Sequence, residues 1–245
     1  MLNGLQAVLY RDINIFMRKA KKQIIASSIS PLLYLIAFGW GFGSHVQVGD
    51  IAYTSFLIPG LITMASLNQS FGINGEINIS RFYFHTFDEY LIAPVSTYEI
   101  VLGEVIYGMM RGFLGAFIVF MYALIFNVKI NFSLLFIIAI VLHTFMFSSL
   151  GVALAMFVRD HASQQSLNTF VITPMIFLCG TFFPIEKLPV IFKAIIHLLP
   201  LTYSTSLIRS TLTGTHLYYW HFLMLIVFCA VFFTLAIYSL KKVEV

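Results

Sequence analysis

The chain has 245 residues, of which 60% are hydrophobic and 10% are charged, and its formal net charge is +4. Soluble domains carry about 25% charged residues and roughly 45–50% apolar ones, so this composition excludes a water-soluble globular protein and places the chain in a lipid bilayer. The basic excess lies at the two ends of the chain, which indicates membrane orientation and not a nucleic-acid surface.

Residues 1–22 are expected to form an amphipathic helix that lies in the membrane interface. Arg11, Asp12 and Asn14 fall largely off its apolar stripe, and the segment is too polar to span. The stripe recurs at steps of three and four residues and consists of Leu2, Leu5, Leu9, Ile13 and Phe16.

Six apolar segments follow, each near the ~20 residues that cross ~30 Å of hydrocarbon. They cover about 24–43, 53–75, 99–126, 133–157, 165–183 and 219–240. An even number of spans puts both termini on one side, and the basic ends predict that this side is the cytoplasm. With no internal repeat or linker, the sequence predicts one all-α integral membrane domain over residues 1–245.

Thr86 and Ser96 each precede a Glu by three residues, which is the pattern of a helix capping box. Thr86 is expected to start a short helix over residues 87–92, which Pro94 ends, and Ser96 to start the third span. The loop between spans two and three is therefore predicted to contain an ordered helix.

The side chains of this short helix separate by type. Phe87, Tyr90 and Leu91 fall on one face, and Asp88 and Glu89 on another. An exposed aromatic face on a polar loop is typical of a surface that binds a soluble partner. A short amphipathic helix lying on the membrane is the alternative.

Charged residues also occur inside or at the edge of the apolar segments. Glu104 and Arg111 are seven residues apart and so lie near one face of a helix, and Glu76 ends the second span. Such residues should face protein or water, because a charge within a span costs roughly 2.5–3.5 kcal/mol on insertion scales. They are expected to make polar contacts near the cytoplasmic entrance or an ion pair beside a gate; snorkelling to the headgroups is the alternative.

Residues 184–218 break the pattern of simple spans. Pro184, Pro189 and Pro200 punctuate apolar runs that are too short to cross. Irregular backbone at membrane depth is tolerated where protein or a wet cavity surrounds it, so two short re-entrant helices are expected at about 188–198 and 201–212. One ordinary outside loop is the alternative.

Other motifs are weaker. Gly108-x-x-x-Gly112 allows close helix packing, either within the chain or between two copies. Cys179 and Cys229 lie in apolar segments and are interpreted as small hydrophobic residues. The histidines lack ligand spacing and no catalytic arrangement is evident, so neither a metal site nor an active site is expected.

Two groups of motifs cover almost the whole chain. The first comprises Pro59-Gly-Leu61, the run 87–94, Leu102-Gly-Glu104 and Arg111-Gly112. The second comprises Gly180-Thr-Phe-Phe-Pro184, Leu188-Pro189 and Leu199-Pro-Leu-Thr-Tyr203 leading to Arg209. Found together in one six-span chain, they resemble the permease subunits of ABC-2 type exporters, such as the nodulation-factor, daunorubicin-resistance and YadH-like permeases.

The resemblance implies a permease in the bacterial cytoplasmic membrane that moves an amphiphilic or hydrophobic substrate, such as a drug, lipid or lipid-linked saccharide. Two copies, expected as a homodimer, would pair with two ATPase subunits. The helix over residues 87–91 would be the coupling helix, and the N-terminal helix with Arg11 would also contact the ATPase. The re-entrant residues would be Pro184, Pro189, Pro200, Tyr203 and Arg209.

The chain has no Gly-x-x-x-x-Gly-Lys-[Ser/Thr] loop, so it is not expected to be an enzyme or to bind a cofactor itself. ATP and Mg would be bound by the partner ATPase. An ion-driven carrier is the alternative; it predicts mid-membrane acids and repeated halves, and neither is evident. An integral-membrane transferase is a third hypothesis. It predicts His, Asp or Glu residues clustered at one membrane face, and the sequence shows no such cluster.

Overall fold

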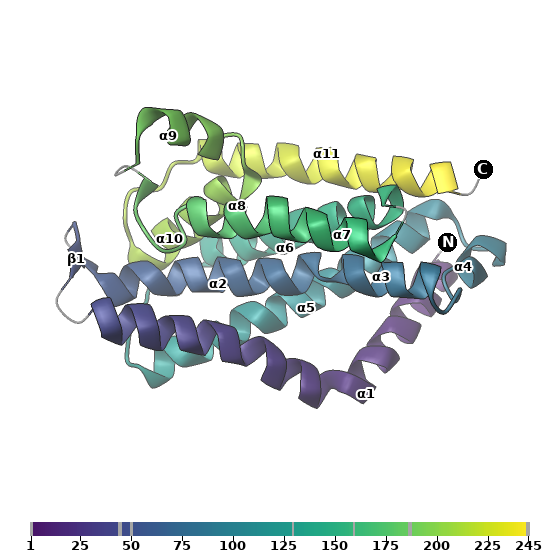
Figure 1. Ribbon diagram of the computed structural model, residues 1–245, viewed down its shortest axis with the longest axis horizontal. Coiled ribbons are helices and arrows are strands. Elements are labelled where there is room, and N and C mark those ends of the chain that lie inside the picture. Colours follow the sequence, from purple (N-terminus) through teal and green to yellow (C-terminus); the bar gives the residue numbers. More distant parts are fainter. Residues whose placement is uncertain are drawn as a thin grey trace.

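Long helices running side by side form the protein. The computed structural model describes residues 2–43, 46–49, 51–128, 130–158, 160–185 and 188–243. The termini and α4 lie at one end of the helices, here called the termini end (Figure 1). The β1 strand lies at the opposite end, here called the hairpin end. The all-α prediction is confirmed.

The first half of the chain holds the elements that surround the polar loop. Their bounds are α1 (Leu2–Tyr34), η1 (Leu35–Phe42, π-helical), β1 (Gln47–Val48), β2 (Ile51–Ala52), α2 (Tyr53–Phe71), α3 (Ile73–Phe82), α4 (Asp88–Ile92) and α5 (Thr97–Ile125). The antiparallel pair β1–β2 forms a small hairpin that no sequence pattern predicted.

The second half begins with a long helix and then becomes interrupted. Its elements are α6 (Leu134–Phe157), α7 (His161–Leu167), η2 (Asn168–Ile172, π-helical), α8 (Thr173–Leu178), α9 (Val190–Ile196), α10 (Pro200–Thr213) and α11 (Trp220–Val243). The fifth predicted span, 165–183, falls on α7, η2 and α8, which are not among the described helices that are long and apolar enough to cross a membrane. Pro174 lies in the first turn of α8. Proline fits that turn because its missing N–H has no helical acceptor there.

Among the described residues, five helices are long and apolar enough to cross a membrane, and six if α9 and α10 count as one bent pair. The five cover Gly4–Gly41, Tyr53–Phe82, Thr97–Ile125, Leu134–Phe157 and Trp220–Lys242. The axes of α9 and α10 meet at 91°, which agrees with the two short helices predicted for the proline-rich region.

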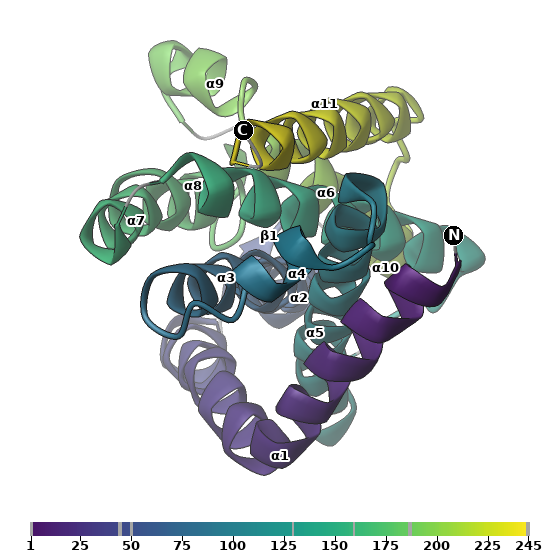
Figure 2. The same ribbon diagram turned by 90° about the vertical axis from the view of Figure 1, so that its right-hand side faces the viewer.

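The predicted interfacial helix and first span are one continuous helix. α1 runs from Leu2 to Tyr34, and η1 extends it. It changes direction along its length, so that its N-terminal part crosses in front of α5 (Figure 2). No proline breaks the helix at this bend; Pro31 lies further along, shortly before the π-helical turns.

Two apolar clusters form the interior. The larger one joins α2, α5, α6, α8 and α10. The smaller one, here called the termini-end cluster, joins α1, α3, α4, α5, α6 and the end of α11. The smaller cluster provides the base on which α4 sits.

Glycines allow close packing of α5 on its neighbours. A Cβ at Gly108 would lie 2.6 Å from Ser148 Oγ, and one at Gly112 would lie 2.7 Å from Thr144 Cγ2. Both contacts are with α6 of the same chain, so the Gly108-x-x-x-Gly112 pattern serves packing within the protein.

Candidate coupling and translocation site

The short helix α4 has an inner and an outer face. Phe87, 1% exposed, and Tyr90, 8% exposed, point into the termini-end cluster with ring centres 5.5 Å apart. Asp88 and Glu89 are exposed, and Ile92 is 85% exposed. The prediction of an outward aromatic face was wrong, because these rings complete the core beneath the helix. A partner would meet the acidic residues and Ile92.

Leu91 belongs to α4, but its side chain lies outside the described part of the structure. The acidic pair stands in the first turn of α4. Negative charge there interacts favourably with the positive end of the helix dipole. Among the described side chains, the outer face of α4 therefore carries the two acidic residues and the large apolar side chain of Ile92.

The capping box predicted at Thr86 was wrong. α4 has Phe87 at its N-cap and no side-chain hydrogen bond there. Thr86 Oγ1 instead accepts a hydrogen bond from Arg11 Nη2 at 3.1 Å and lies 2.7 Å from Ser80 Oγ. Thr86 therefore attaches the loop to α1 and α3.

The second predicted capping box is present. Ser96 Oγ accepts from the Glu99 backbone N–H at 3.4 Å, and Glu99 Oε2 accepts from the Ser96 backbone N–H at 3.0 Å. This reciprocal pair fixes the start of α5 directly after the loop that carries α4.

Arg11 is the residue that connects α1 to α4. Its guanidinium lies 4.7 Å from the centre of the Tyr90 ring, in addition to its bond with Thr86. Burial, with the nearby charges of Glu104 and Asp12, raises the pKa of the Tyr90 phenol, so the hydroxyl stays protonated at neutral pH.

Asp12 is a candidate functional residue that was not predicted from the sequence. It was placed off the packed face, yet it is only 7% exposed. It stands one helical turn after Val8, which is fully buried, so helical spacing alone could have found it. Glu104, 5% exposed, lies within electrostatic range of both Asp12 and Arg11.

Arg111 pairs with Glu76 and not with Glu104. Arg111 Nη1 lies 2.7 Å from Glu76 Oε1, and the Tyr107 hydroxyl donates to Glu76 Oε2 at 3.0 Å. Glu104 and Arg111 therefore do not form the ion pair that their spacing on one helix face suggested. α3 places Glu76 beside Arg111, whereas Glu104 faces α1.

Two glutamines extend this arrangement to α1. Arg111 Nη2 donates to Gln69 Oε1 at 3.4 Å, and Gln23 Nε2 donates to the same oxygen at 3.2 Å. A polar chain therefore runs from Gln23 on α1 through Gln69 and Arg111 to Glu76; it is called the polar chain below. Gln23 and Gln69 had no sequence signal beyond being polar residues in apolar segments.

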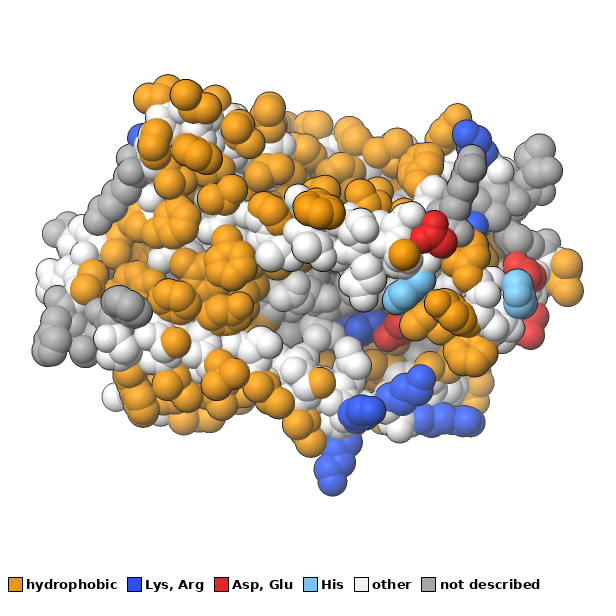
Figure 3. Space-filling view, viewed as in Figure 1, with side chains coloured by type: hydrophobic (Ala, Val, Ile, Leu, Met, Phe, Trp, Pro, Cys, Tyr) orange, Lys and Arg blue, Asp and Glu red, His pale blue; other side chains and the backbone are white. Residues whose placement is uncertain are grey.

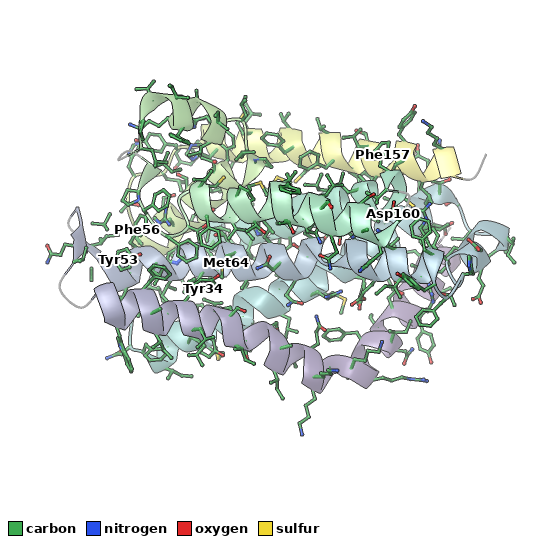
Figure 4. The ribbon with its side chains drawn as sticks, viewed as in Figure 1. Tyr34, Tyr53, Phe56, Met64, Phe157 and Asp160 are labelled. Atoms are coloured by element: carbon green, nitrogen blue, oxygen red, sulfur yellow. The ribbon has the colours of Figure 1, made fainter. Side chains whose placement is uncertain are left out.

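Arg209 joins three segments at the hairpin end. Its Nη2 donates to the Gly180 carbonyl at 2.5 Å and its Nε to the Phe56 carbonyl at 3.3 Å. Its guanidinium also lies 3.8 Å from the centre of the Phe56 ring. Figure 4 shows Phe56 and Tyr53 at this end of α2, and the Tyr53 hydroxyl donates to the Phe182 carbonyl at 2.8 Å.

The prolines of this region occupy helix boundaries. Pro189 is the N-cap of α9, and Pro200 begins α10, where its missing N–H leaves no bond unmade. Pro184 lies between α8 and α9, next to residues outside the described part. The buried Tyr203 donates its hydroxyl to the His197 carbonyl at 2.5 Å, which stabilises the turn between α9 and α10.

An aromatic cluster not found from the sequence lies beside this region. The Phe182 ring centre lies 5.2 Å from that of Tyr34, 5.3 Å from that of Phe38 and 5.2 Å from that of Phe177. The cluster connects α1 and η1 to α8, and aromatic contacts of this kind suit an apolar or amphiphilic surface. No described group of three or more His, Cys, Asp or Glu has the geometry to hold a metal ion.

These features define a multi-pass helical membrane protein with an ordered polar loop at one end and a broken helix pair at the other. Residues 3–213 match the family model described as ABC-2 type transporter. The chain belongs to this family, whose members are the membrane permease components of ABC transporters and work with an ABC ATPase subunit.

Similar proteins cover most of the chain. Inner membrane transport permease YadH of Escherichia coli (strain K12) is 29% identical over 215 residues, which are 86% of this chain and 83% of that protein. Nodulation protein J of Rhizobium leguminosarum bv. viciae is 29% identical over 215 residues, 85% and 82% of the two chains. Nodulation protein J of Sinorhizobium fredii (strain NBRC 101917 / NGR234) is 29% identical over 206 residues, 83% and 79%. The family resemblance stated from the motifs is confirmed.

Proposed function

We propose that this chain is the membrane-spanning subunit of an ATP-driven exporter, with ATP and Mg bound by separate ATPase subunits. In this proposal, two copies of the chain form a homodimer, two ATPase subunits attach at the termini end, and that end faces the cytoplasm. Family membership and the two-faced helix α4 support it most directly.

The outer face of α4 is the surface on which we place the ATPase. Asp88, Glu89 and Ile92 are exposed there, while Phe87 and Tyr90 hold the helix to the interior. If a partner bound to the exposed face displaces α4, the buried face of α4 displaces the residues on which it packs.

Two routes lead from α4 into the long helices. Phe87 and Tyr90 share the termini-end cluster with α5 and α6, and Arg11 connects Tyr90 and Thr86 to α1. A change in ATPase separation would thus alter the position of α1 against α5. Transport then requires two conformations whose substrate affinities differ and whose populations depend on nucleotide state.

The substrate we propose is an amphiphile. The membrane part carries few charges, and two of them, Arg111 and Glu76, are paired with each other. The aromatic cluster around the buried Phe182 includes the exposed Phe177, which offers a surface for apolar groups near the hairpin end. A small, highly charged solute would find little to bind along such a path.

The proposal is tested by co-purification with candidate ATPase subunits, with Ile92→Asp as the variant. The wild-type chain should co-purify with one of the candidate ATPases. The Ile92→Asp variant should lose this ATPase and still fold, since the Ile92 side chain is exposed and does not belong to the apolar core. Retention of no ATPase by the wild type would reject the proposal and favour ion-gradient flux assays. A reporter fused after Val245 should be cytoplasmic; an outside signal would reject the orientation.

A further inference from the structure

Four cations gather on α1 within five residues. They are Arg18, Lys19, Lys21 and Lys22, and all four are exposed. Figure 3 shows Lys and Arg side chains gathered below the molecule, at the place where Figure 1 shows α1 changing direction. No salt bridge joins any of the four to an acidic side chain in the described part of the chain.

The same four side chains border a shallow, open groove of about 520 Å³, and all of its lining residues belong to α1. The rest of its lining is apolar and comes from Ile25, Ala26 and Ile29, further along the helix. With a rise of about 1.5 Å per residue, Ile29 stands roughly 10 Å beyond Lys22. The groove therefore has a cationic mouth and an apolar floor, in the order in which a phospholipid presents its headgroup and its chains.

Gln23 attaches the same turn of α1 to α2. Its amide donates to Gln69 on α2 at 3.2 Å, and so it joins the polar chain that leads to Arg111 and Glu76. This turn of α1 is thus attached to the protein through Gln23, while its four cations have no acidic partner in the part of the chain that the structure describes.

We infer that this groove is a binding site for an acidic phospholipid, with the phosphate among the four cations and an acyl chain along Ile25 and Ile29. Charge complementarity selects this occupant, because each Lys or Arg near an anionic membrane surface adds favourable energy and the apolar floor excludes a purely ionic ligand. The lipid would support the bend of α1 and hold Gln23 against Gln69.

The site can be tested by tryptophan quenching that does not depend on any ATPase. The chain has two tryptophans, Trp40 and Trp220, which are replaced by Phe. Ile29→Trp then places one reporter on the groove floor. The protein is reconstituted in phosphatidylcholine vesicles with increasing fractions of brominated phosphatidylglycerol or brominated phosphatidylcholine.

The groove predicts quenching by the brominated acidic lipid at a mole fraction roughly three-fold lower or more than by brominated phosphatidylcholine. This preference should shrink as salt is raised, because screening weakens the contact with the phosphate. Equal quenching by the two lipids would overturn the inference.

A second reporter separates the groove from general attraction to a basic surface. Tyr238→Trp, made in the same background, lies on α11 shortly before Lys241 and Lys242, where the native Tyr238 is 61% exposed. It should show little preference for the acidic lipid. The same preference at both reporters would overturn the inference in favour of a diffuse ion atmosphere.

Variants of the cations complete the test. Lys21→Gln with Lys22→Gln should reduce the preference at the groove reporter, whereas Lys241→Gln with Lys242→Gln should leave it unchanged. Replacing Lys19, Lys21 and Lys22 by Arg keeps the charge and should keep the preference, which separates charge from folding damage. Loss in the Arg variant, or an equal loss in the Lys241 and Lys242 variant, would count against the site.

Discussion

The guanidinium of Arg11 lies 4.7 Å from the centre of the Tyr90 ring. This contact joins an N-terminal helix to a short loop helix more than seventy residues later in the chain, and Thr86 adds a 3.1 Å hydrogen bond to it. It places α1 and α4 in one unit at the termini end, so a partner that moves α4 also moves α1.

Arg11→Ala should weaken this unit. A partly desolvated cation–π contact contributes about 0.5–2 kcal/mol, and a hydrogen bond about 1 kcal/mol more. We expect a thermal midpoint in detergent lower by several degrees and weaker stimulation of ATP hydrolysis. Tyr10→Ala is the matched control, because Tyr10 is 73% exposed on the same helix. Equal behaviour of the two variants would reject the role of Arg11.

Phe87 and Ile92 should separate stability from partner binding. Phe87→Ala removes a buried ring and is expected to cost about 3–5 kcal/mol of unfolding free energy. Ile92→Ala should change stability by less than about 0.5 kcal/mol, since surface substitutions usually do. Denaturant unfolding measures the unfolding free energy of both variants. An unaffected Phe87→Ala protein would show that the ring does not support α4.

Arg111 should couple energetically to Glu76 and not to Glu104. A double-mutant cycle of Arg111→Leu with Glu76→Gln is expected to give an interaction energy of about 0.5–3 kcal/mol. The corresponding cycle with Glu104→Gln should give a value close to zero. A larger coupling to Glu104 would favour the pairing inferred from helix spacing over the one in the structure.

Gly60 should not tolerate a side chain. A Cβ there would lie 2.2 Å from the Thr181 carbonyl oxygen, between α2 and the segment after α8. Gly60→Ala is therefore expected to destabilise the protein or to separate these segments. Gly75→Ala is the control, because no atom lies within 4 Å of its Cβ position and alanine favours a helix by up to about 1 kcal/mol. Thermal unfolding of the two variants should shift in opposite directions.

The sequence predicted what depends on local pattern. Apolar length predicted most of the spans, the Ser96–Glu99 pair predicted the start of α5, and the prolines predicted the broken region before α11. Each of these follows from residues close together in the chain.

The errors concern contacts between segments. Thr86 has a capping pattern, but Arg11 binds its side chain from α1. Glu104 and Arg111 share a helix face, but α3 supplies the partner of Arg111. The aromatic residues of α4 turn inward because α1, α5 and α6 leave an apolar surface beneath them. A pattern within one segment does not predict contacts between residues of different segments.

The central claim is that the acidic outer face of α4 receives the ATPase. Its most direct test is ATP hydrolysis by the complex in lipid vesicles, comparing the wild type with Asp88→Lys combined with Glu89→Lys. Asp160→Asn is the control, because it removes an exposed acid toward the same end (Figure 4) while asparagine can still cap α7. We expect hydrolysis in the double variant to fall to the level of the isolated ATPase subunit, with the control unchanged. Hydrolysis equal to that of the wild type in the double variant would contradict the claim.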